Sequence, residues 1–279
     1  MTNTAVITGG AGGMGLATAK LMGDDHRIVI ADVNSERLDA AVAELTDLGV
    51  DAIAVTSDIT DRASVDAMFE QAESGGHVRA VVHTAGVSPQ MGDAQFIARI
   101  NAVGTVNICE SYLRIAADGD AIVNVASIAG HMSPAFLQPT RTFKLALTDP
   151  TRFAEKIERS SNLLPKPARP GAAYSTSKAF VIWYSRAMAA AFGAKGARIL
   201  SVSPGSFDTE MGRLEEKSGS RKLLEFAAIK RFGTPEEAAA VLAFAASEAP
   251  GYLTGTDILV DGGTKAGLNL KGMITMARG

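Results

Sequence analysis

The residues of this chain best suited to chemistry are Tyr174 and Lys178, four positions apart in the run Tyr-Ser-Thr-Ser-Lys. On a helix, side chains at this spacing lie on one face, so the phenol and the ammonium group share one space. At an effective dielectric constant of 20 and a separation of about 5 Å, the lysine charge favours the phenolate by roughly 3 kcal/mol and lowers the pKa of the tyrosine. The pair can supply a base near neutral pH, although this spacing also occurs by chance on solvated helices.

A glycine-rich segment at residues 8 to 15, Thr-Gly-Gly-Ala-Gly-Gly-Met-Gly, directly follows the first predicted strand. Glycines permit a tight turn and let a pyrophosphate approach backbone N–H groups at the positive end of a helix. Because the segment lies between a predicted strand and a predicted helix, it indicates a dinucleotide site rather than an ordinary turn.

Asp32 ends the second predicted strand, where a carboxylate accepts hydrogen bonds from an adenosine ribose and repels a 2′-phosphate. No lysine or arginine occurs in the glycine-rich segment or at Val33, so the sequence favours NAD over NADP. Arg37 lies nearby, and we expect it on a solvated helix face. Two roles remain open for the side chain of Asp58. It either contacts the edge of the adenine or caps the helix that follows from Asp61.

Seven short apolar runs, rich in valine and isoleucine, are the candidate strands, and helical patterns fill the intervals between them. They are residues 4 to 8, 27 to 32, 51 to 55, 78 to 84, 121 to 126, 198 to 202 and 258 to 260. This alternation predicts an α/β fold with a doubly wound parallel sheet of the Rossmann type. We expect Ser35 to cap the helix that runs to about Leu48, and Thr234 to cap a later helix.

Residues 131 to 170 interrupt the alternation, since they hold six of the ten prolines. Proline prevents a long helix or strand from crossing the segment, which is therefore an excursion from the sheet. Within it, Asp149 and Pro150 indicate the start of a short helix, with Phe153 and Ile157 on its apolar face. We expect a single catalytic domain over residues 1 to 263 that contains this excursion, and a C-terminal tail over 264 to 279.

Composition excludes several classes of protein. The 279 residues, 47% of them hydrophobic, are enough for one α/β domain with a large core. A net charge of -3 without a basic, aromatic-interleaved stripe argues against binding to nucleic acid. The single cysteine, Cys109, excludes an intrachain disulfide and is expected in the core. The chain shows no signal peptide and no 18-residue apolar stretch, so we expect a cytoplasmic protein with no membrane partner. We also expect no metal site.

With these motifs in hand, the chain resembles the short-chain dehydrogenase/reductase family over nearly its whole length. The family pattern Thr-Gly-x-x-x-Gly-x-Gly matches Thr8, Gly9, Gly13 and Gly15. The resemblance carries the catalytic set over to Asn101, Ser127, Tyr174 and Lys178. It also implies that the cofactor is bound by Gly9, Gly13, Met14, Gly15, Asp32, Asp58, Ile59, Ala85, Gly86, Tyr174, Lys178, Pro204, Gly205, Phe207 and Thr209.

The resemblance implies hydride and proton exchange between NAD and a secondary alcohol or ketone. In the oxidative direction Tyr174 would take the hydroxyl proton, while Ser127 would hold the substrate oxygen. Lys178 would lower the pKa of the tyrosine and bind the nicotinamide ribose, and Asn101 would hold a water that links this lysine to solvent. The run from Ser203 to Thr209 would contact the nicotinamide amide.

Two departures from the family pattern stand out. His83 and Thr84 precede Ala85 where relatives usually have two asparagines, and we expect His83 to be a hydrogen-bonded core residue rather than a proton donor. The interval from Ser127 to Tyr174 is 47 positions, longer than in most relatives. A similar insertion occurs in bacterial hydroxysteroid dehydrogenase/carbonyl reductase relatives.

The substrate wall is expected from residues 128 to 131, from residues 206 to 230, and from the excursion. The apolar residues of the excursion either favour a bulky apolar substrate such as a hydroxysteroid, or only pack the excursion onto the body. They are Phe136, Leu137, Phe143, Leu145, Leu147 and Phe153.

Two other functions remain open at this point. The glycine-rich segment also fits an extended-type nucleotide-sugar epimerase or dehydratase, through Gly9, Gly12 and Gly15, but only 101 residues follow Lys178. A non-catalytic, NAD-binding regulatory protein is the other alternative. The helix predicted from Tyr174 to about Phe192 has a wide apolar band, so we expect a homo-oligomer, a dimer or tetramer, unless the excursion blocks that contact.

Overall fold

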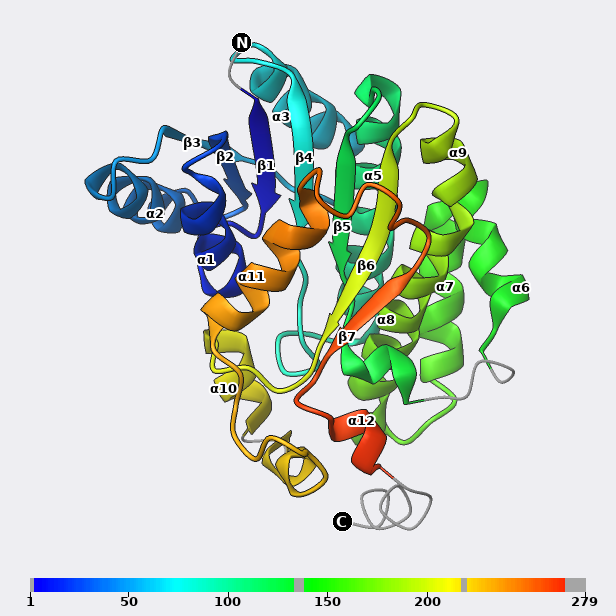
Figure 1. Ribbon diagram of the computed structural model, residues 1–279. Helices are drawn as coiled ribbons and strands as arrows, with labels where there is room; N and C mark the ends of the chain where they lie inside the picture. The colour runs from blue at the N-terminus through cyan, green and yellow to red at the C-terminus, as the bar shows by residue number, and fades with distance from the viewer. Residues whose placement is uncertain (1–2, 133–137, 217–219, 269–279) are drawn as a thin grey trace.

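The computed structural model describes residues 3 to 132, 138 to 216 and 220 to 268. Within them, seven parallel strands form one sheet in the order β3-β2-β1-β4-β5-β6-β7 (Figure 1). The strands are β1 (Thr4–Thr8), β2 (Arg27–Asp32), β3 (Ala52–Thr56), β4 (Val78–His83), β5 (Ala121–Val125), β6 (Arg198–Pro204) and β7 (Asp257–Val260). This confirms the predicted Rossmann-type α/β fold in a single domain.

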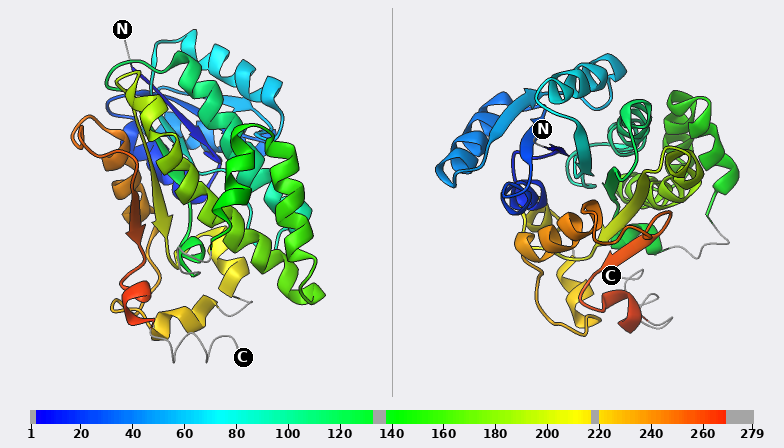
Figure 2. Two further views of the ribbon diagram at one scale, coloured as in Figure 1. Left: turned by 90° about the vertical axis from the view of Figure 1, so that its right-hand side faces the viewer. Right: turned by 45° about the horizontal axis from the view of Figure 1, so that its top comes forward.

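Helices cover both faces of the sheet (Figure 2). One face carries α1 (Gly13–Met22), α2 (Ser35–Asp47) and α11 (Pro235–Ala246), and the other carries α3 (Arg62–Glu73), α5 (Thr105–Ile115) and α8 (Arg169–Ala187). Alternate residues of each strand enter the two cores, so Ile7 packs on the first face and Val6 on the second, both fully buried. The apolar runs predicted from the sequence are continuous because both faces are covered.

Shorter elements complete the described chain. They are α4 (Ala94–Ala98), the π-helix η1 (Arg99–Gly104), the 3₁₀ turns η2 (Ile128–His131), η4 (Lys144–Leu147), η5 (Lys166–Ala168) and η6 (Ser220–Glu225), and the helices α6 (Thr140–Phe143), α7 (Pro150–Ser161), α9 (Ala189–Gly193), α10 (Glu210–Glu216) and α12 (Thr264–Gly267).

The helix starts test two capping predictions. Thr234 caps α11 as expected, in a reciprocal capping box with Glu237. The prediction for Ser35 is wrong, because Asn34 is the cap of α2 and its side chain accepts a hydrogen bond from the backbone N–H of Arg37. Asn34 has the extended backbone that a cap requires, whereas Ser35 is already helical.

The excursion folds mainly into helices. Asp149 caps α7, as the sequence indicates, and both Phe153 and Ile157 are buried. After η5 the chain enters α8 at Arg169, so Tyr174 lies one turn inside the helix rather than at its start. The sequence-based boundary is wrong because Pro170 lies within the first turn of α8, where proline needs no backbone hydrogen bond.

The wide apolar band of α8 is covered in part by the chain itself. Helix α7 packs on α8 and α4, on the side of α8 that faces away from the sheet (Figure 1). Phe180, Val181 and Tyr184 are at most 1% exposed in the single chain. Burial of these three side chains therefore does not require a second subunit, whereas Ala187 and Ala191 of the same band are exposed in the single chain.

Two groups of predicted residues lie outside the described part of the chain. They are Phe136 and Leu137 of the excursion, and the C-terminal tail beyond Leu268.

Candidate active site

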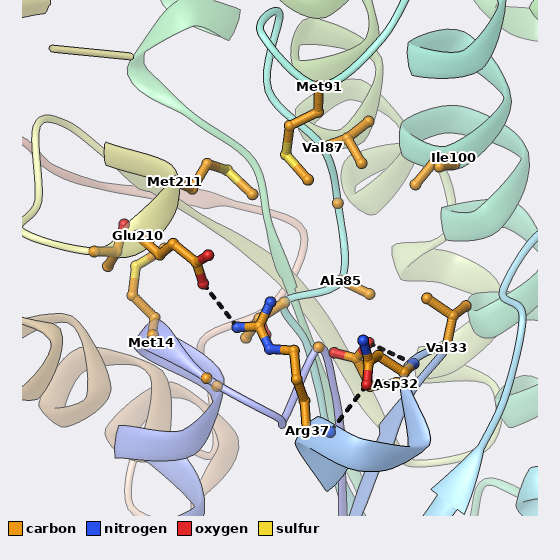
Figure 3. Close-up of a pocket in the computed structure, with 18 of the residues that line it drawn as sticks. Met14, Asp32, Val33, Arg37, Ala85, Val87, Met91, Ile100, Glu210 and Met211 are labelled. Atoms are coloured by element: carbon orange, nitrogen blue, oxygen red, sulfur yellow. Dashed lines mark hydrogen bonds and ion pairs between the residues drawn. The ribbon is translucent and has the colours of Figure 1, made fainter. Parts of the chain in front are cut away.

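A cleft opens at the carboxyl ends of β1 and β4, where the strand order reverses direction. Open parallel sheets bind their ligands at this switch point. The cleft holds a cavity of about 430 Å³, within the size range of small-molecule and cofactor sites. Its lining comes from the glycine-rich segment, the ends of β2 and β3, the loop after β4, and α10 (Figure 3).

The glycine-rich segment has the geometry of a phosphate cradle. Gly9 has a φ of +67°, and a Cβ on it would lie 2.8 Å from the backbone nitrogen of Ala85. A Cβ on Gly15 would lie 2.4 Å from the carbonyl oxygen of Gly9. The first turn of α1 has neither a side-chain cap nor an acidic residue, so its N–H groups face the cleft without a competing carboxylate in that turn. These residues fit the pyrophosphate of a dinucleotide.

At the other end of the cavity lie Asp32 and Arg37. Asp32 ends β2, and its Oδ1 accepts a 3.2 Å hydrogen bond from the backbone N–H of Asn34. Arg37 lies on a solvated helix face as expected, with its side chain 51% exposed, and it has a second role that the sequence did not indicate. Its side chain lines the cavity, reaches Gly12 and donates from Nη2 to Glu210 at 2.9 Å, because a long arginine in the first turn of α2 can extend across the cleft.

Of the two residues after β3 that were predicted to bind the cofactor, Asp58 and Ile59, only one lines the cavity. Ile59 is buried and lines the cavity. Asp58 is exposed and does not line it, because its Oδ1 accepts hydrogen bonds from the backbone N–H and the hydroxyl of Thr60, both at 2.8 Å. Asp61 is itself the cap of α3. The side chain of Asp58 therefore stabilises the turn before that helix.

The loop after β4 passes close to the glycine-rich segment. Thr84 donates from Oγ1 to the carbonyl oxygen of Thr8 at 2.7 Å, and both Ala85 and Gly86 line the cavity. His83 is 2% exposed, with Nδ1 2.7 Å from the hydroxyl of Thr8 and Nε2 3.2 Å from that of Thr105. Burial, together with the charge of Lys178, lowers the pKa of His83 to about 3. A neutral, hydrogen-bonded core histidine agrees with the sequence-based expectation.

Three of the predicted residues converge at the inner end of this loop. A Cβ placed on Gly86 would lie 3.1 Å from Oδ1 of Asn101 and 3.4 Å from Nζ of Lys178. Asn101 belongs to η1, and its amide exchanges hydrogen bonds with the backbone of Val87 at 2.9 and 3.0 Å. Lys178 donates from Nζ to the carbonyl oxygen of Val125 at 2.9 Å. Asn101 thus holds the loop, while Lys178 is anchored at the end of β5.

Ser127 lies at the start of η2, and Tyr174 lies one turn before Lys178 in α8. Ser127 is 8% exposed and begins η2, where its Oγ accepts a 3.1 Å hydrogen bond from the backbone N–H of Ala129. A Cβ on Gly130 would lie 2.8 Å from the carbonyl carbon of Lys178, so this glycine lets η2 pack directly on α8. The ring centre of Tyr174 is 5.9 Å from Nζ of Lys178.

The segment after β6 forms the opposite wall. Gly205 donates its backbone N–H to Val260 at 2.8 Å, and a Cβ there would lie 2.7 Å from Asp261. Phe207 is buried, and Thr209 lines the cavity near Gly13. Pro204 ends the strand. This wall brings α10 over the cavity.

Part of the predicted cofactor set lies along the cavity. Lining residues are Gly9, Gly13, Met14, Gly15, Asp32, Ile59, Ala85, Gly86 and Thr209, whereas Asp58, Pro204, Gly205, Phe207, Tyr174 and Lys178 are not among them. The predicted cofactor set did not contain Met91, Ile100 and Glu210, which also line the cavity, although Glu210 falls within the substrate wall expected from residues 206 to 230. The position of Glu210 directly after Thr209 was the one available signal.

The apolar residues of the excursion were expected either to contact a bulky substrate or to pack the excursion onto the body, and the described ones differ in burial. Phe143 and Phe153 are fully buried and pack edge to face at 5.9 Å, and Phe153 lies 4.4 Å from Phe180 between ring centres. Leu147 is 44% exposed, and Leu145 packs against the core. For Phe143 and Phe153 the structure favours packing onto the body over contact with a substrate.

His131, expected in the substrate wall, is held by the sheet instead. Its Nε2 lies 2.9 Å from Oδ2 of Asp257, whose side chain is 1% exposed, and 3.2 Å from the hydroxyl of Ser203. This contact ties the end of η2 to β6 and β7.

The residues that the structure describes contain neither a metal-binding cluster nor a membrane-spanning helix. No group of three or more metal-ligating side chains could hold a metal ion in that part of the chain. None of its helices has the length and apolar character needed to span a membrane.

The parallel sheet, the glycine cradle and the residues around Lys178 together define a dinucleotide-binding oxidoreductase. The family model for short chain dehydrogenase matches residues 3–157, and a second, described as Enoyl-(Acyl carrier protein) reductase, matches residues 160–265. The chain therefore belongs to the short-chain dehydrogenase/reductase family.

Several known proteins are similar to this chain. The short-chain dehydrogenase/reductase bsc3 of Alternaria brassicicola is 29% identical, over 96% of this chain and 98% of that protein. The cis-4-hydroxycyclohexanecarboxylate dehydrogenase of Sinomonas cyclohexanicum is 30% identical, over 94% and 96%. A short chain dehydrogenase from Burkholderia cenocepacia, solved in complex with NADP, has the same fold, with a TM-score of 0.75 at 24% identity over 95% and 98% of the two chains.

Proposed function

We propose that this oxidoreductase interconverts a secondary alcohol and a ketone and that it prefers NAD to NADP. The observation that carries the proposal is the convergence of Lys178, Asn101 and Gly86 beside the dinucleotide cleft, with Tyr174 one helical turn before the lysine. A bound nicotinamide dinucleotide would supply the hydride chemistry through its nicotinamide ring, and Gly9 and Gly13 would hold its pyrophosphate.

The proton is the part of the reaction that falls to the side chains of this chain. In the oxidative direction, Tyr174 takes the hydroxyl proton at its phenolic oxygen, and the positive charge of Lys178 favours the phenolate that accepts it. Ser127 donates a hydrogen bond to the substrate oxygen, since its own Oγ accepts from Ala129 and keeps its proton available. Asn101 keeps the loop after β4 in place against Lys178 and is the proposed anchor of a water beside it.

The preference for NAD is proposed on the position of Asp32. Its carboxylate lines the adenosine end of the cavity, where it can accept from a ribose hydroxyl but repels a 2′-phosphate. Since the Burkholderia cenocepacia structure contains NADP, the family alone does not decide between the two cofactors.

The substrate class is proposed to be bulky and apolar. Val87, Met91, Met211 and Leu214 give one side of the cleft an apolar lining. The similarity to a hydroxycyclohexanecarboxylate dehydrogenase adds support for a ring alcohol, of which hydroxysteroids are the larger members. Rates of NADH formation with cyclic, steroid and linear secondary alcohols test this choice, and a preference for short linear alcohols would contradict it.

Replacing Tyr174 by phenylalanine tests the mechanism. We expect Tyr174→Phe to lower kcat by about 10² to 10⁴, the usual contribution of an acid or base, while NAD binding stays nearly unchanged. Tyr252→Phe is the matched control, because Tyr252 is fully exposed. A kcat close to that of the wild type in the Tyr174→Phe variant would rule out the proposed base.

The same assays separate the alternative functions. Tight NAD binding without NADH formation from any alcohol would favour a regulatory protein, and turnover of a nucleotide sugar would favour an epimerase or dehydratase. A cytoplasmic location and a dimer or tetramer are further proposals, of which the oligomer is tested by sedimentation.

A further inference from the structure

The adenosine end of the cavity carries an ion pair that joins two distant elements. Nη2 of Arg37, in the first turn of α2, donates to Oε2 of Glu210, the first residue of α10, at 2.9 Å (Figure 3). The two residues are 173 positions apart. Both line the cavity, and Figure 3 shows the arginine extending from beside Asp32 toward Met14 and Glu210.

The charges around this end of the cavity form a small, unbalanced set. Among the residues that line it, the acidic ones are Asp32 and Glu210, and Arg37 alone is basic. The guanidinium lies directly above the glycine-rich segment, since a Cβ on Gly12 would be 2.8 Å from its Nη2. Among the described residues that line the cavity, the one cation near the adenosine ribose is therefore already bound to a carboxylate.

We propose that Glu210 is a cofactor-specificity residue, which disfavours NADP by engaging Arg37 and adding its negative charge to that of Asp32. This inference rests on the proposed preference for NAD and assigns part of that preference to a residue outside the adenosine-binding strand.

The physical reason is competition for one guanidinium. The 2′-phosphate of NADP adds a charge of about −1.5 to −2 near neutral pH, and an arginine near the ribose accommodates it with charge-assisted hydrogen bonds. While Arg37 donates to Glu210, a 2′-phosphate must share this cation and approach a second carboxylate. NAD carries a neutral hydroxyl at the same place, so the pair does not oppose it.

The exposure of the pair sets the size of the effect. The side chains of Arg37 and Glu210 are 51% and 74% exposed, and Glu210 engages one nitrogen of the guanidinium. Exposed ion pairs are weak and screened by salt, so we expect neutralising Glu210 to change affinity for a 2′-phosphate about five- to tenfold rather than a thousandfold.

The test measures binding of two small probes that lack nicotinamide, ADP and adenosine 2′,5′-bisphosphate. We expect Glu210→Gln to bind adenosine 2′,5′-bisphosphate about five- to tenfold more tightly in low salt, with a much smaller change for ADP, and the gain to shrink as salt rises. Glu36→Gln is the matched control, because it removes the same charge next to Arg37 in sequence from an exposed residue that does not line the cavity.

A second variant tests whether Glu210 acts through Arg37. Arg37→Met in the Glu210→Gln background is expected to remove most of the gain and to leave only the part that comes from the lost carboxylate charge. Equal gains in Glu210→Gln and Glu36→Gln, equal gains for both probes, or a gain that is undiminished without Arg37 would each overturn the inference.

Failure of the proposed function has a different signature. If the wild-type chain binds ADP but forms no NADH from any alcohol, the proposed reaction fails while the binding ratio still decides the role of Glu210. If it binds neither probe, both proposals are overturned. Because Glu210 is exposed, an unchanged melting temperature should accompany the variant.

Discussion

Phe153 in α7 is the residue whose replacement best separates packing from recognition in the excursion. Its side chain is fully buried, with ring centres of Phe180 and Phe143 at 4.4 and 5.9 Å. Phe180 belongs to α8, less than two turns after Tyr174, so the ring of Phe153 supports the helix that carries the proposed base. We expect Phe153→Ala to weaken the fold and leave substrate preference alone.

The magnitude follows from burial and the cavity that remains. Removing a buried phenyl ring loses a transfer free energy of about 2 to 3 kcal/mol. The cavity between α7 and α8 adds roughly 1 to 2 kcal/mol, since two neighbouring rings can relax only in part. The sum of about 4 kcal/mol corresponds to a fall in Tm of about 8 to 12 °C for a chain of this size.

The assay combines thermal or urea unfolding with kcat/KM for a cyclic, a steroid and a linear alcohol at a temperature where both proteins are folded. Leu163→Ala is the control, because Leu163 lies just beyond α7 and is 87% exposed, so its loss changes stability by less than about 0.5 kcal/mol. An unchanged Tm together with an altered order of substrates would refute the reasoning, since the ring would then face the substrate rather than the core.

The other predictions concern the glycine-rich segment and the buried His83 at the end of β4. Gly9→Ala should lower both NAD affinity and Tm, because its φ is +67° and a Cβ would lie 2.8 Å from the backbone of Ala85; Gly49→Ala, also at positive φ but with nothing within 4 Å, is the control, and equal losses would contradict the steric argument. Burial lowers the pKa of His83 to about 3, so between pH 6.5 and 3 the unfolded chain binds a proton that the folded chain does not. Stability from this residue is therefore complete above pH 6.5 and falls by up to about 1.4 kcal/mol per pH unit below it. Urea unfolding at pH 7.5 and 5 should show a shallower decline for His83→Gln than for the wild type, and parallel declines would mean that the histidine is already charged in the fold.

Much of the fold could be predicted because the information is local. The strands are runs of valine and isoleucine that both faces of the sheet must bury, and the starts of β1, β2 and β4 fall where these runs begin. The boundary of α8 was less predictable, since Pro170 reads equally as a helix breaker or as a first-turn residue. Whether Pro170 breaks or begins the helix depends on how the following turns of α8 pack.

By itself, the sequence determined the features that need only neighbouring residues. These are the glycine-rich turn before α1, the acidic end of β2 at Asp32, and the spacing of Tyr174 and Lys178, because backbone conformation and helical periodicity act within a few positions. Only the tertiary structure decided which distant side chains meet. It turned Asp58 away from the cavity, placed Phe153 against Phe180, and brought Arg37 to Glu210. Such contacts depend on the path of the whole chain and on the rotamers of long side chains, which no local pattern specifies.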